Sequence, residues 1–400
     1  MGMILAVFVV GSGLYAMDAP FLSGSGDRSD PGPSGQALSG KPSVAPSDRS
    51  AVPSGCRPAP LAERAARVLM MGLPEVTEPS DPLIAKLLEL GVGGVLISTY
   101  NVESATQVTN LVKGIRSRSS RPMLVSTDEE PGRVSTFVDL FGPTPSARRL
   151  AAERTTAEVR DFARQTGARL AALGVDFDLA PVADLDDGPS RGIVGDRSFS
   201  SDPDTAFQYA LAYANGLADA GVRPLAKHFP GHGRSTADSH VRATETVRAT
   251  LDDLMGTDLR PFRNLIDAGI PVVMMNHVSY SLFEPAVPAS LSPKAYELLR
   301  SLGFQGAAIT DSLGMAAVNL RYHPSDAALA AVKAGADGVL MTDGWAAENM
   351  RDTLVEAVQS GRLSEQRLDQ AAARMTALAG GDPVAFACQD VRMPSLRQTP

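Results

Sequence analysis

Residues 222–233 read Val-Arg-Pro-Leu-Ala-Lys-His-Phe-Pro-Gly-His-Gly, and they contain the unit from which the chain is built. The first part, Val222–Ala226, is a short apolar segment that we expect to form a buried strand. The second part, Lys227–Gly233, carries one lysine and two histidines, and its proline and glycines predict a loop. A strand that leads directly into such a loop brings hydrogen-bonding side chains to its carboxyl end.

Short apolar runs of this kind recur through residues 61–380 and alternate with helical patterns. The expected strands are Val68–Gly72, Gly94–Ser98, Pro122–Ser126, Phe177–Ala180, Val222–Ala226, Val272–Met275, Ala307–Thr310 and Gly338–Met341. The expected helices are Pro82–Leu90, Ala105–Arg116, Ala147–Leu173, Thr205–Ala220, Leu251–Ala268, Pro293–Leu302, Ala327–Ala334, Ala346–Gln359 and Ser364–Leu378. This alternation favours an α/β fold with a single (β/α)8 TIM-type barrel domain over an open doubly wound sheet.

The two ends of the chain differ in composition from this barrel region. Residues 1–20 form an apolar segment that suits a secretory signal and is too short to span a bilayer, although no Lys or Arg precedes it. Residues 21–60 are rich in Ser, Gly, Pro and Asp and predict a disordered linker. We expect the barrel over residues 61–385 and a tail over 386–400, loosely ordered from about Gly380. These features predict an exported bacterial protein, extracellular or associated with the cell envelope, with its N-terminus as a candidate membrane tether.

Charge and cysteine content exclude some classes of function. The net charge is −8, which predicts no basic surface for nucleic acid. The two cysteines, Cys56 and Cys388, do not form a zinc-site pattern. They are either a disulfide that closes the domain in an oxidising compartment or two unrelated thiols, and the sequence leaves both interpretations open.

Polar residues follow several of the expected strands at the point where each strand ends. Asp128 follows the third strand, and Asp184 lies shortly after the fourth. Lys227 follows the fifth, His277 the sixth and Asp311 the seventh. In a (β/α)8 barrel these ends meet at one face, where active sites lie, so we expect the side chains to converge.

Three segments resemble those of one enzyme family. They are Lys227–Gly233 followed by Asp238-Ser239-His240, then Gly195–Ser200 (Gly-Asp-Arg-Ser-Phe-Ser), and Thr310–Met315 (Thr-Asp-Ser-Leu-Gly-Met). Together they resemble the signatures of glycoside hydrolase family 3 β-N-acetylglucosaminidases (β-hexosaminidases) of the NagZ type. The resemblance extends from about Ala62 to Met375 and implies no metal and no organic cofactor.

The resemblance implies a catalytic role for three residues. Asp311 would be the nucleophile, because a retaining glycosidase forms a covalent glycosyl-enzyme intermediate. Judged without the resemblance, Asp311 is as well explained as a helix N-cap. His240 would be the acid and base, oriented by Asp238. Residues spaced i and i+2 face the same way in an extended segment, and a free imidazole titrates near neutrality.

The resemblance also implies a set of substrate-binding side chains. These are Asp128, Arg197, Lys227, His228, Asp184 and His277. One departure from the family pattern is Pro131, which stands where the family has Gly and which lacks an amide donor. The role of the neighbouring Glu130 is therefore left open.

The sequence as a whole predicts a monomeric, retaining exo-β-N-acetylglucosaminidase. Its carbohydrate substrate would be terminal β-linked N-acetylglucosamine in peptidoglycan fragments of the cell wall. One alternative is a phosphorylase on the same scaffold, in which phosphate replaces water. A second alternative, of a different class, is a non-catalytic sugar-binding protein held on a tether.

Overall fold

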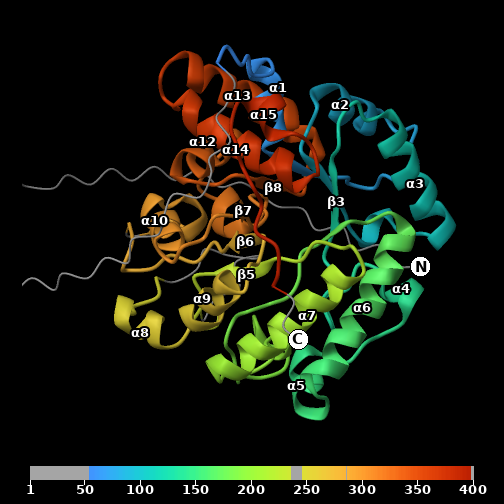
Figure 1. The fold of residues 1–400 in the computed structure, drawn as a ribbon, viewed down its shortest axis with the longest axis vertical. Coiled ribbons are helices and arrows are strands. Elements are labelled where there is room, and N and C mark those ends of the chain that lie inside the picture. Colours follow the sequence, from blue (N-terminus) through green and yellow to red (C-terminus); the bar gives the residue numbers. More distant parts are fainter. Residues whose placement is uncertain (1–53, 236–245, 285, 398–400) are drawn as a thin grey trace, which may run out of the picture. The chain divides into compact units, whose positions relative to one another are not determined.

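The computed structural model describes residues 54–235, 246–284 and 286–397, and these residues belong to one unit of the chain. The expected signal-like segment and most of the linker lie outside the described residues, as do Asp238 and His240. Within the described part, short strands alternate with helices, as expected for an α/β fold (Figure 1). None of the described helices combines the length and the apolar character that crossing a membrane requires.

The strands form two parallel sheets. Their bounds are β1 (Leu69–Gly72), β2 (Gly94–Ile97), β3 (Leu124–Thr127), β4 (Phe177–Asp178), β5 (Ala226–Phe229), β6 (Val272–Met275), β7 (Ala307–Thr310) and β8 (Val339–Met341). One sheet has the order β4-β3-β2-β1-β8 and the other the order β5-β6-β7. Isolated parallel bridges join Phe177 to Arg223 and Ile309 to Gly338, so hydrogen bonds also connect the β4 region with the β5 region and β7 with β8.

Alternate side chains of each strand pack into different apolar clusters. In β1, Met70 packs with Leu340 of β8, Ile309 of β7 and other strand residues. Its neighbours Leu69 and Met71 belong to the second cluster, which includes side chains of the helices. This is the two-residue period of a strand with both faces buried. It explains why the strands appear in the sequence as continuous apolar runs.

Strand β5 differs from the prediction made from its sequence. The expected strand was Val222–Ala226 with a loop from Lys227, whereas β5 covers Ala226–Phe229. Lys227 and His228 are therefore strand residues, and both are buried. The prediction is wrong because their charged and polar groups are paired with carboxylates from distant segments. This pairing offsets the cost of burying them.

Helices occur in every region where one was predicted, although two of the predicted helices are divided, and further short helices are added. The α-helices are α1 (Leu61–Arg67), α2 (Pro82–Leu90), α3 (Ala105–Arg118), α4 (Val138–Phe141), α5 (Ala147–Glu153), α6 (Thr156–Leu173), α7 (Pro203–Asp219), α8 (Leu251–Gly256), α9 (Leu259–Asp267), α10 (Pro293–Ser301), α11 (Ala316–Asn319), α12 (Pro324–Ala334), α13 (Ala347–Gln359), α14 (Glu365–Leu378) and α15 (Pro383–Ala387). The 3₁₀ helices are η1 (Thr99–Asn101), η2 (Gly195–Arg197), η3 (Ala289–Leu291) and η4 (Gly344–Ala346).

One predicted helix, Ala147–Leu173, is divided into α5 and α6. The break lies at Thr155, whose hydroxyl accepts the N–H of Glu158 while the Glu158 carboxylate accepts the N–H of Thr155. This reciprocal capping box starts a new helix. The predicted helix Leu251–Ala268 is likewise divided, into α8 and α9.

The C-terminal segment is more ordered than its sequence predicted. Helix α15 buries Phe386, whose ring lies 5.0 Å from the Arg121 guanidinium carbon. Cys56 and Cys388 form a disulfide with their Cα atoms 5.9 Å apart, which decides between the two interpretations. The expectation of loose order from about Gly380 is therefore wrong for the described residues. The apolar side chain of Phe386 and the covalent link hold the segment to the rest of the unit.

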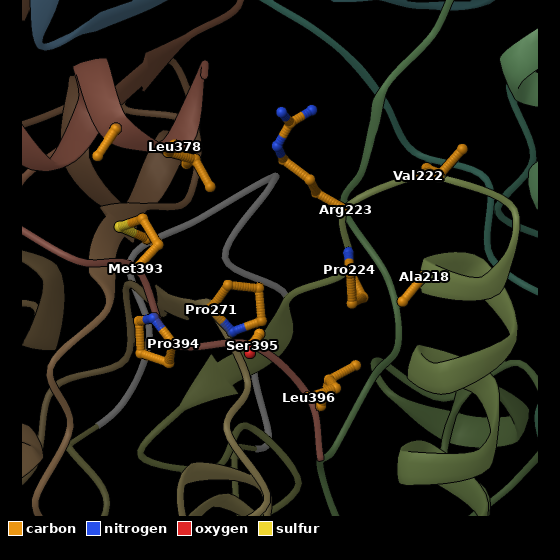
Figure 2. A pocket seen from close by; sticks show the side chains of 12 residues that line it. Ala218, Val222, Arg223, Pro224, Pro271, Leu378, Met393, Pro394, Ser395 and Leu396 are labelled. Carbon is orange, nitrogen blue, oxygen red and sulfur yellow. The ribbon is translucent and has the colours of Figure 1, made fainter. Parts of the chain in front are cut away.

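The last described residues line a hollow of about 340 Å³ (Figure 2). Met393–Leu396 face Arg223, Pro224 and Pro271 there. The N–H of Arg397 donates to the Ala268 carbonyl at 2.9 Å and holds the end of this segment in place. Because Pro224 and Pro271 precede β5 and β6, this hollow lies at the amino ends of the strands. It is therefore distinct from the predicted site at the carboxyl ends.

Candidate active site

The strands position the predicted site residues at one edge. Asp128 directly follows β3, Lys227 and His228 lie in β5, and Asp311 directly follows β7. Each strand is buried, so its position is fixed on both faces before the polar residue is reached. Among the described residues, no group of three or more His, Cys, Asp or Glu side chains is placed to hold a metal ion.

A buried carboxylate, Glu130, lies at the centre of one network. It accepts two hydrogen bonds from Arg197, at 2.7 and 2.6 Å, and one from Lys227 Nζ at 2.7 Å. Lys227 Nζ also donates to Asp128 Oδ1 at 2.6 Å. The same lysine therefore connects one fully buried carboxylate with Asp128, whose side chain is 37% exposed.

This network keeps Glu130, Lys227 and Arg197 charged. Burial alone raises the pKa of Glu130, but the charges of Arg197 and Lys227 outweigh it and hold that pKa well below its usual range. Burial lowers the pKa of Lys227, and the two carboxylates more than reverse this and raise it. Arg197 behaves in the same way, with Glu130 as the main partner. The result is a pair of permanent cations at the carboxyl edge of the strands.

Glu130 was not among the predicted site residues. In the sequence, Glu130 is a carboxylate two positions after Asp128. Its role was left open because the next residue, Pro131, departs from the family pattern. Arg197 was predicted to bind substrate. In the structure its ion pair is with Glu130, and Asp196 instead pairs with Arg133.

A second network orients His228. Its Nδ1 lies 2.6 Å from Asp184 Oδ2, and its Nε2 lies 3.4 Å from Arg197 Nη2. Because a guanidinium only donates, Nε2 is the acceptor and the ring proton sits on Nδ1, donating to Asp184. The backbone N–H groups of His228 and His232 also donate to Asp184 Oδ1. Burial raises the pKa of Asp184, but His228 and these donors outweigh it and lower that pKa.

His232 lies beside this network, with its ring centroid 5.8 Å from that of His228. Burial first, and the nearby His228 second, lower its pKa to about 4. The His232 ring is therefore neutral above about pH 5.

Residues after β6 support the same segment from the other side. Asn276 Nδ2 donates to the His228 carbonyl at 3.1 Å and lies 2.9 Å from the Tyr280 hydroxyl. That hydroxyl donates to the Gly231 carbonyl at 2.6 Å. Tyr280 was missed in the sequence because its contact, with a residue 49 positions earlier, is not visible from local patterns.

His277 lies next to the Asp311 segment. Its Nε2 lies 2.8 Å from the Ser312 carbonyl, so this nitrogen carries the proton and donates. Its Nδ1 lies 2.7 Å from Ser290 Oγ and accepts from that hydroxyl. The ring thus holds the residue that follows Asp311. Substrate binding by His277 stays a prediction.

Asp311 is partly exposed at the end of β7. Its N–H donates to the Met275 carbonyl at 2.9 Å, and its Oδ1 accepts the Ser312 N–H at 2.7 Å. The next helix, α11, begins at Ala316 with Met315 at its N-cap. The helix-cap interpretation of Asp311 is therefore wrong, and the carboxylate remains at the strand end with a fixed orientation.

Comparisons with known proteins agree with this geometry. The family model described as "Glycosyl hydrolase family 3 N terminal domain" matches residues 62–378. The beta-hexosaminidase LpqI of Mycobacterium tuberculosis is 40% identical over 334 residues, covering 78% of this chain and 85% of that protein. A beta-hexosaminidase of Alkalilimnicola ehrlichii is 39% identical over 281 residues, covering 68% of this chain and 80% of that one.

Solved structures give the same result. A glycosyl hydrolase of the GH3 family from Mycobacterium smegmatis superposes with a TM-score of 0.75 at 40% identity, covering 80% of this chain and 97% of that chain. A family 3 beta-N-acetylglucosaminidase from a Paenibacillus species superposes with a TM-score of 0.77 at 30% identity, covering 85% of this chain and 65% of that chain.

Proposed function

Because the chain belongs to glycosyl hydrolase family 3, it is a glycoside hydrolase, and we propose that it removes terminal β-linked N-acetylglucosamine with retention of configuration. Its relatives are named as beta-hexosaminidases and a beta-N-acetylglucosaminidase, which supports this substrate class. The observation that carries the proposal is the position of Asp311. Its carboxylate is fixed at the end of β7, at the same edge as the charged network around Glu130.

The proposed reaction has two steps. In the first, an Asp311 carboxylate oxygen forms a bond with the anomeric carbon as the glycosidic C–O bond breaks, and His240 gives its proton to the leaving oxygen. In the second, His240 takes a proton from water, the water oxygen attacks the anomeric carbon, and the Asp311 carboxylate is released. Asp238 would orient His240. Both residues lie outside the described part of the chain, so the dyad rests on the sequence resemblance.

The two networks would hold the non-reducing sugar. Lys227 has three N–H donors and uses two of them on Asp128 and Glu130, which leaves one for a sugar hydroxyl. Asp128 is open to solvent and can accept from hydroxyl groups. Asp184 would act by fixing the His228 ring, and Arg197 by fixing Glu130 and Lys227. Such fixed donors and acceptors favour one orientation of a polyhydroxylated ring.

The proposal extends to the fold and the location of the protein. The two parallel sheets would be parts of one closed eight-stranded barrel, which the bridges between the β4 and β5 regions and between β7 and β8 support. The Cys56–Cys388 disulfide supports an oxidising compartment and therefore export. Peptidoglycan fragments would then be the accessible substrate, and the enzyme would act as a monomer.

The test compares the wild type with Asp311→Asn on an aryl N-acetylglucosaminide. Release of the aryl group should fall by a factor on the order of 10³ or more, because no covalent intermediate can form. The matched control is Asp326→Asn, which makes the same chemical change at an exposed position in the first turn of α12. Retained activity in Asp311→Asn would refute the nucleophile assignment.

The same assay separates the alternatives. A sugar 1-phosphate formed in phosphate buffer would identify a phosphorylase, because phosphate would then replace water in the second step. Saturable sugar binding with no turnover by the wild type would identify a non-catalytic binding protein. A lower rate on the matching glucoside would confirm that the acetamido group is recognised.

A further inference from the structure

Exposed large apolar side chains lie at the carboxyl ends of the strands. Among the described residues the most exposed are Tyr100 at 75%, Leu320 at 68% and Trp345 at 51%. Tyr100 lies in η1 after β2, Leu320 follows α11 after β7, and Trp345 lies in η4 after β8. Segments that follow parallel strands meet at one edge, and this edge also carries Asp311. The exposed apolar surface is therefore at the edge of the proposed site.

Trp345 is held on a fixed backbone. Its N–H donates to Asp343 Oδ1 at 3.0 Å. The preceding Gly344 lies so close to β1 that a Cβ there would come within 2.4 Å of the Gly72 carbonyl oxygen. Ala347, two positions after Trp345 and the first residue of α13, is fully buried. The indole ring is thus exposed although the backbone that carries it is not free to move, so little ordering cost remains when a ligand contacts the ring.

The segment that carries Trp345 contacts the segment that carries the nucleophile. The N–H of Leu313 donates to the Leu340 carbonyl of β8 at 2.9 Å. The hydroxyl oxygens of Ser312 and Thr342 lie 3.4 Å apart. Ser312 directly follows Asp311, and Thr342 is three positions before Trp345. The segments that follow β7 and β8 therefore form one continuous surface.

The orientation of a bound substrate places its leaving group over this surface. The side chains proposed to hold the non-reducing sugar come from β5 and from the segments after β3 and β4. The anomeric carbon must lie against Asp311 after β7. Asp311 attacks one face of the anomeric carbon, and the leaving oxygen departs from the opposite face. A β-linked leaving group is equatorial, so it continues the long direction of the ring away from the β3–β5 side, towards the segments that follow β7 and β8.

We propose that Trp345 is a specificity-determining residue that stacks on the pyranose ring of the leaving group. The inference rests on the proposed function and deepens it. A pyranose ring presents an apolar face of C–H groups, and an indole ring offers a large flat surface with few side-chain torsions to restrict. The preferred substrates are then glycosides of another sugar, rather than glycosides with small leaving groups.

The kinetic test uses two substrates that share the non-reducing sugar. One is the β-1,4-linked disaccharide of N-acetylglucosamine, and the other is N-acetylglucosaminyl azide, whose leaving group has no ring. Trp345→Ala should lower kcat/KM for the disaccharide about 10-fold and change that for the azide by less than about twofold. Trp345→Phe should restore most of the loss. Leu251→Ala, which truncates an exposed apolar side chain in α8 after β5, should change neither.

The outcomes separate this proposal from the one on which it rests. Equal losses on both substrates, or no loss on the disaccharide, would overturn the role of Trp345 and leave the proposed function intact. A wild type that cleaves neither substrate would refute the proposed function and the role of Trp345 with it.

Fluorescence gives a second, independent test. Trp345 is the single tryptophan of the chain, so tryptophan emission reports on this residue alone. In the Asp311→Asn variant, which prevents turnover, the disaccharide should shift the emission to shorter wavelength in a saturable way. The monosaccharide N-acetylglucosamine, which has no second ring, should not. An unchanged spectrum at a disaccharide concentration shown by calorimetry to be saturating would overturn the proposal.

Discussion

At the amino ends of the strands, Asp337 is buried among three arginines. Its carboxylate accepts from Arg300 at 2.6 Å, Arg367 at 2.5 Å and Arg374 at 3.1 Å, and from the Ala308 N–H at 3.0 Å. At the carboxyl ends, Glu130 is buried between Arg197 and Lys227. In both places burial raises the pKa of the carboxyl group, and the neighbouring cations lower it by more. The resulting pKa of Asp337 is about 2. A shifted pKa therefore does not distinguish the two sites.

The two sites differ in what the network joins together. The arginines around Asp337 come from helices, Arg300 from α10 and Arg367 and Arg374 from α14, so this network ties helices to the start of β8. The partners of Glu130 come from β5 and from η2, and they lead to the solvent-exposed carboxylate of Asp128. The first arrangement serves stability. The second leaves the Asp128 carboxylate open to solvent, where the proposed function needs an acceptor for a sugar, and it lies at the same edge of the strands as Asp311.

Among the changes that test this comparison, Glu130→Gln should have the largest effect on activity. This change keeps the shape of the side chain but removes the charge that holds Arg197 and Lys227 in place. We expect kcat/KM on an aryl N-acetylglucosaminide to fall on the order of 100-fold, because both cations lose their fixed positions. The rate is measured at a temperature where circular dichroism shows the variant to be folded. A folded Glu130→Gln variant with wild-type kcat/KM would show that the Glu130 network, like that of Asp337, serves stability and not activity.

The second effect is the loss of stability in Asp337→Asn. Removing the carboxylate leaves three arginines without their shared partner, and we expect the free energy of unfolding to fall by about 3–5 kcal/mol. Urea denaturation measures this change. The value of kcat/KM should stay at the wild-type level below the unfolding transition. A loss of activity as large as that of Glu130→Gln would contradict the division of roles.

The stability that Asp337→Asn loses relative to the wild type should decrease as the pH falls. The pKa of Asp337 is lowered on folding, so its stabilisation is present above the unfolded pKa, about 3.9. It is lost as the pH falls from there towards about 2. The difference in stability between the wild type and Asp337→Asn should therefore be constant near neutral pH and shrink below about pH 4.

The sequence predicted those parts of the fold that depend on local patterns. Val272–Met275 and Ala307–Thr310 were predicted with the bounds that β6 and β7 have, because each is an apolar run buried along its whole length. The position of Asp311 follows from the second of them. The resemblance supplied the expected roles of Asp128, Arg197, Lys227 and His228, and the structure brings these residues into hydrogen-bonded networks.

What the sequence could not show depends on distant partners. Lys227 was expected in a loop because a proline and two glycines follow it within six residues. Its partner Asp128, which makes its burial possible, is 99 residues away. Glu130 and Arg197 are 67 residues apart, so local patterns did not reveal their pairing. The disulfide joins residues separated by 332 positions, and nothing near either cysteine decides between a bridge and two thiols.

The smallest effect should come from a third buried carboxylate, Asp178, which lies at the same edge as Glu130 but forms no ion pair with the described residues. Its Oδ1 accepts the Glu129 N–H at 3.0 Å, and within the described part of the chain its Oδ2 has no hydrogen-bond partner. Burial raises the pKa of Asp178 well above its usual value. The folded state therefore favours the protonated form, and its contribution to stability is present below the unfolded pKa and is lost as the pH rises.

Asp178→Asn imitates the protonated acid and keeps the acceptor for Glu129. We expect the variant to match the wild type near pH 4 and to exceed it in free energy of unfolding by about 1 kcal/mol at pH 8, where the wild type must bury a charge or bind a proton. Urea denaturation at the two pH values measures this. A variant that is less stable than the wild type at pH 8 would mean that Asp178 is ionised and paired. Asp178 would then belong to the buried charged groups of the carboxyl end, together with Glu130 and Asp184.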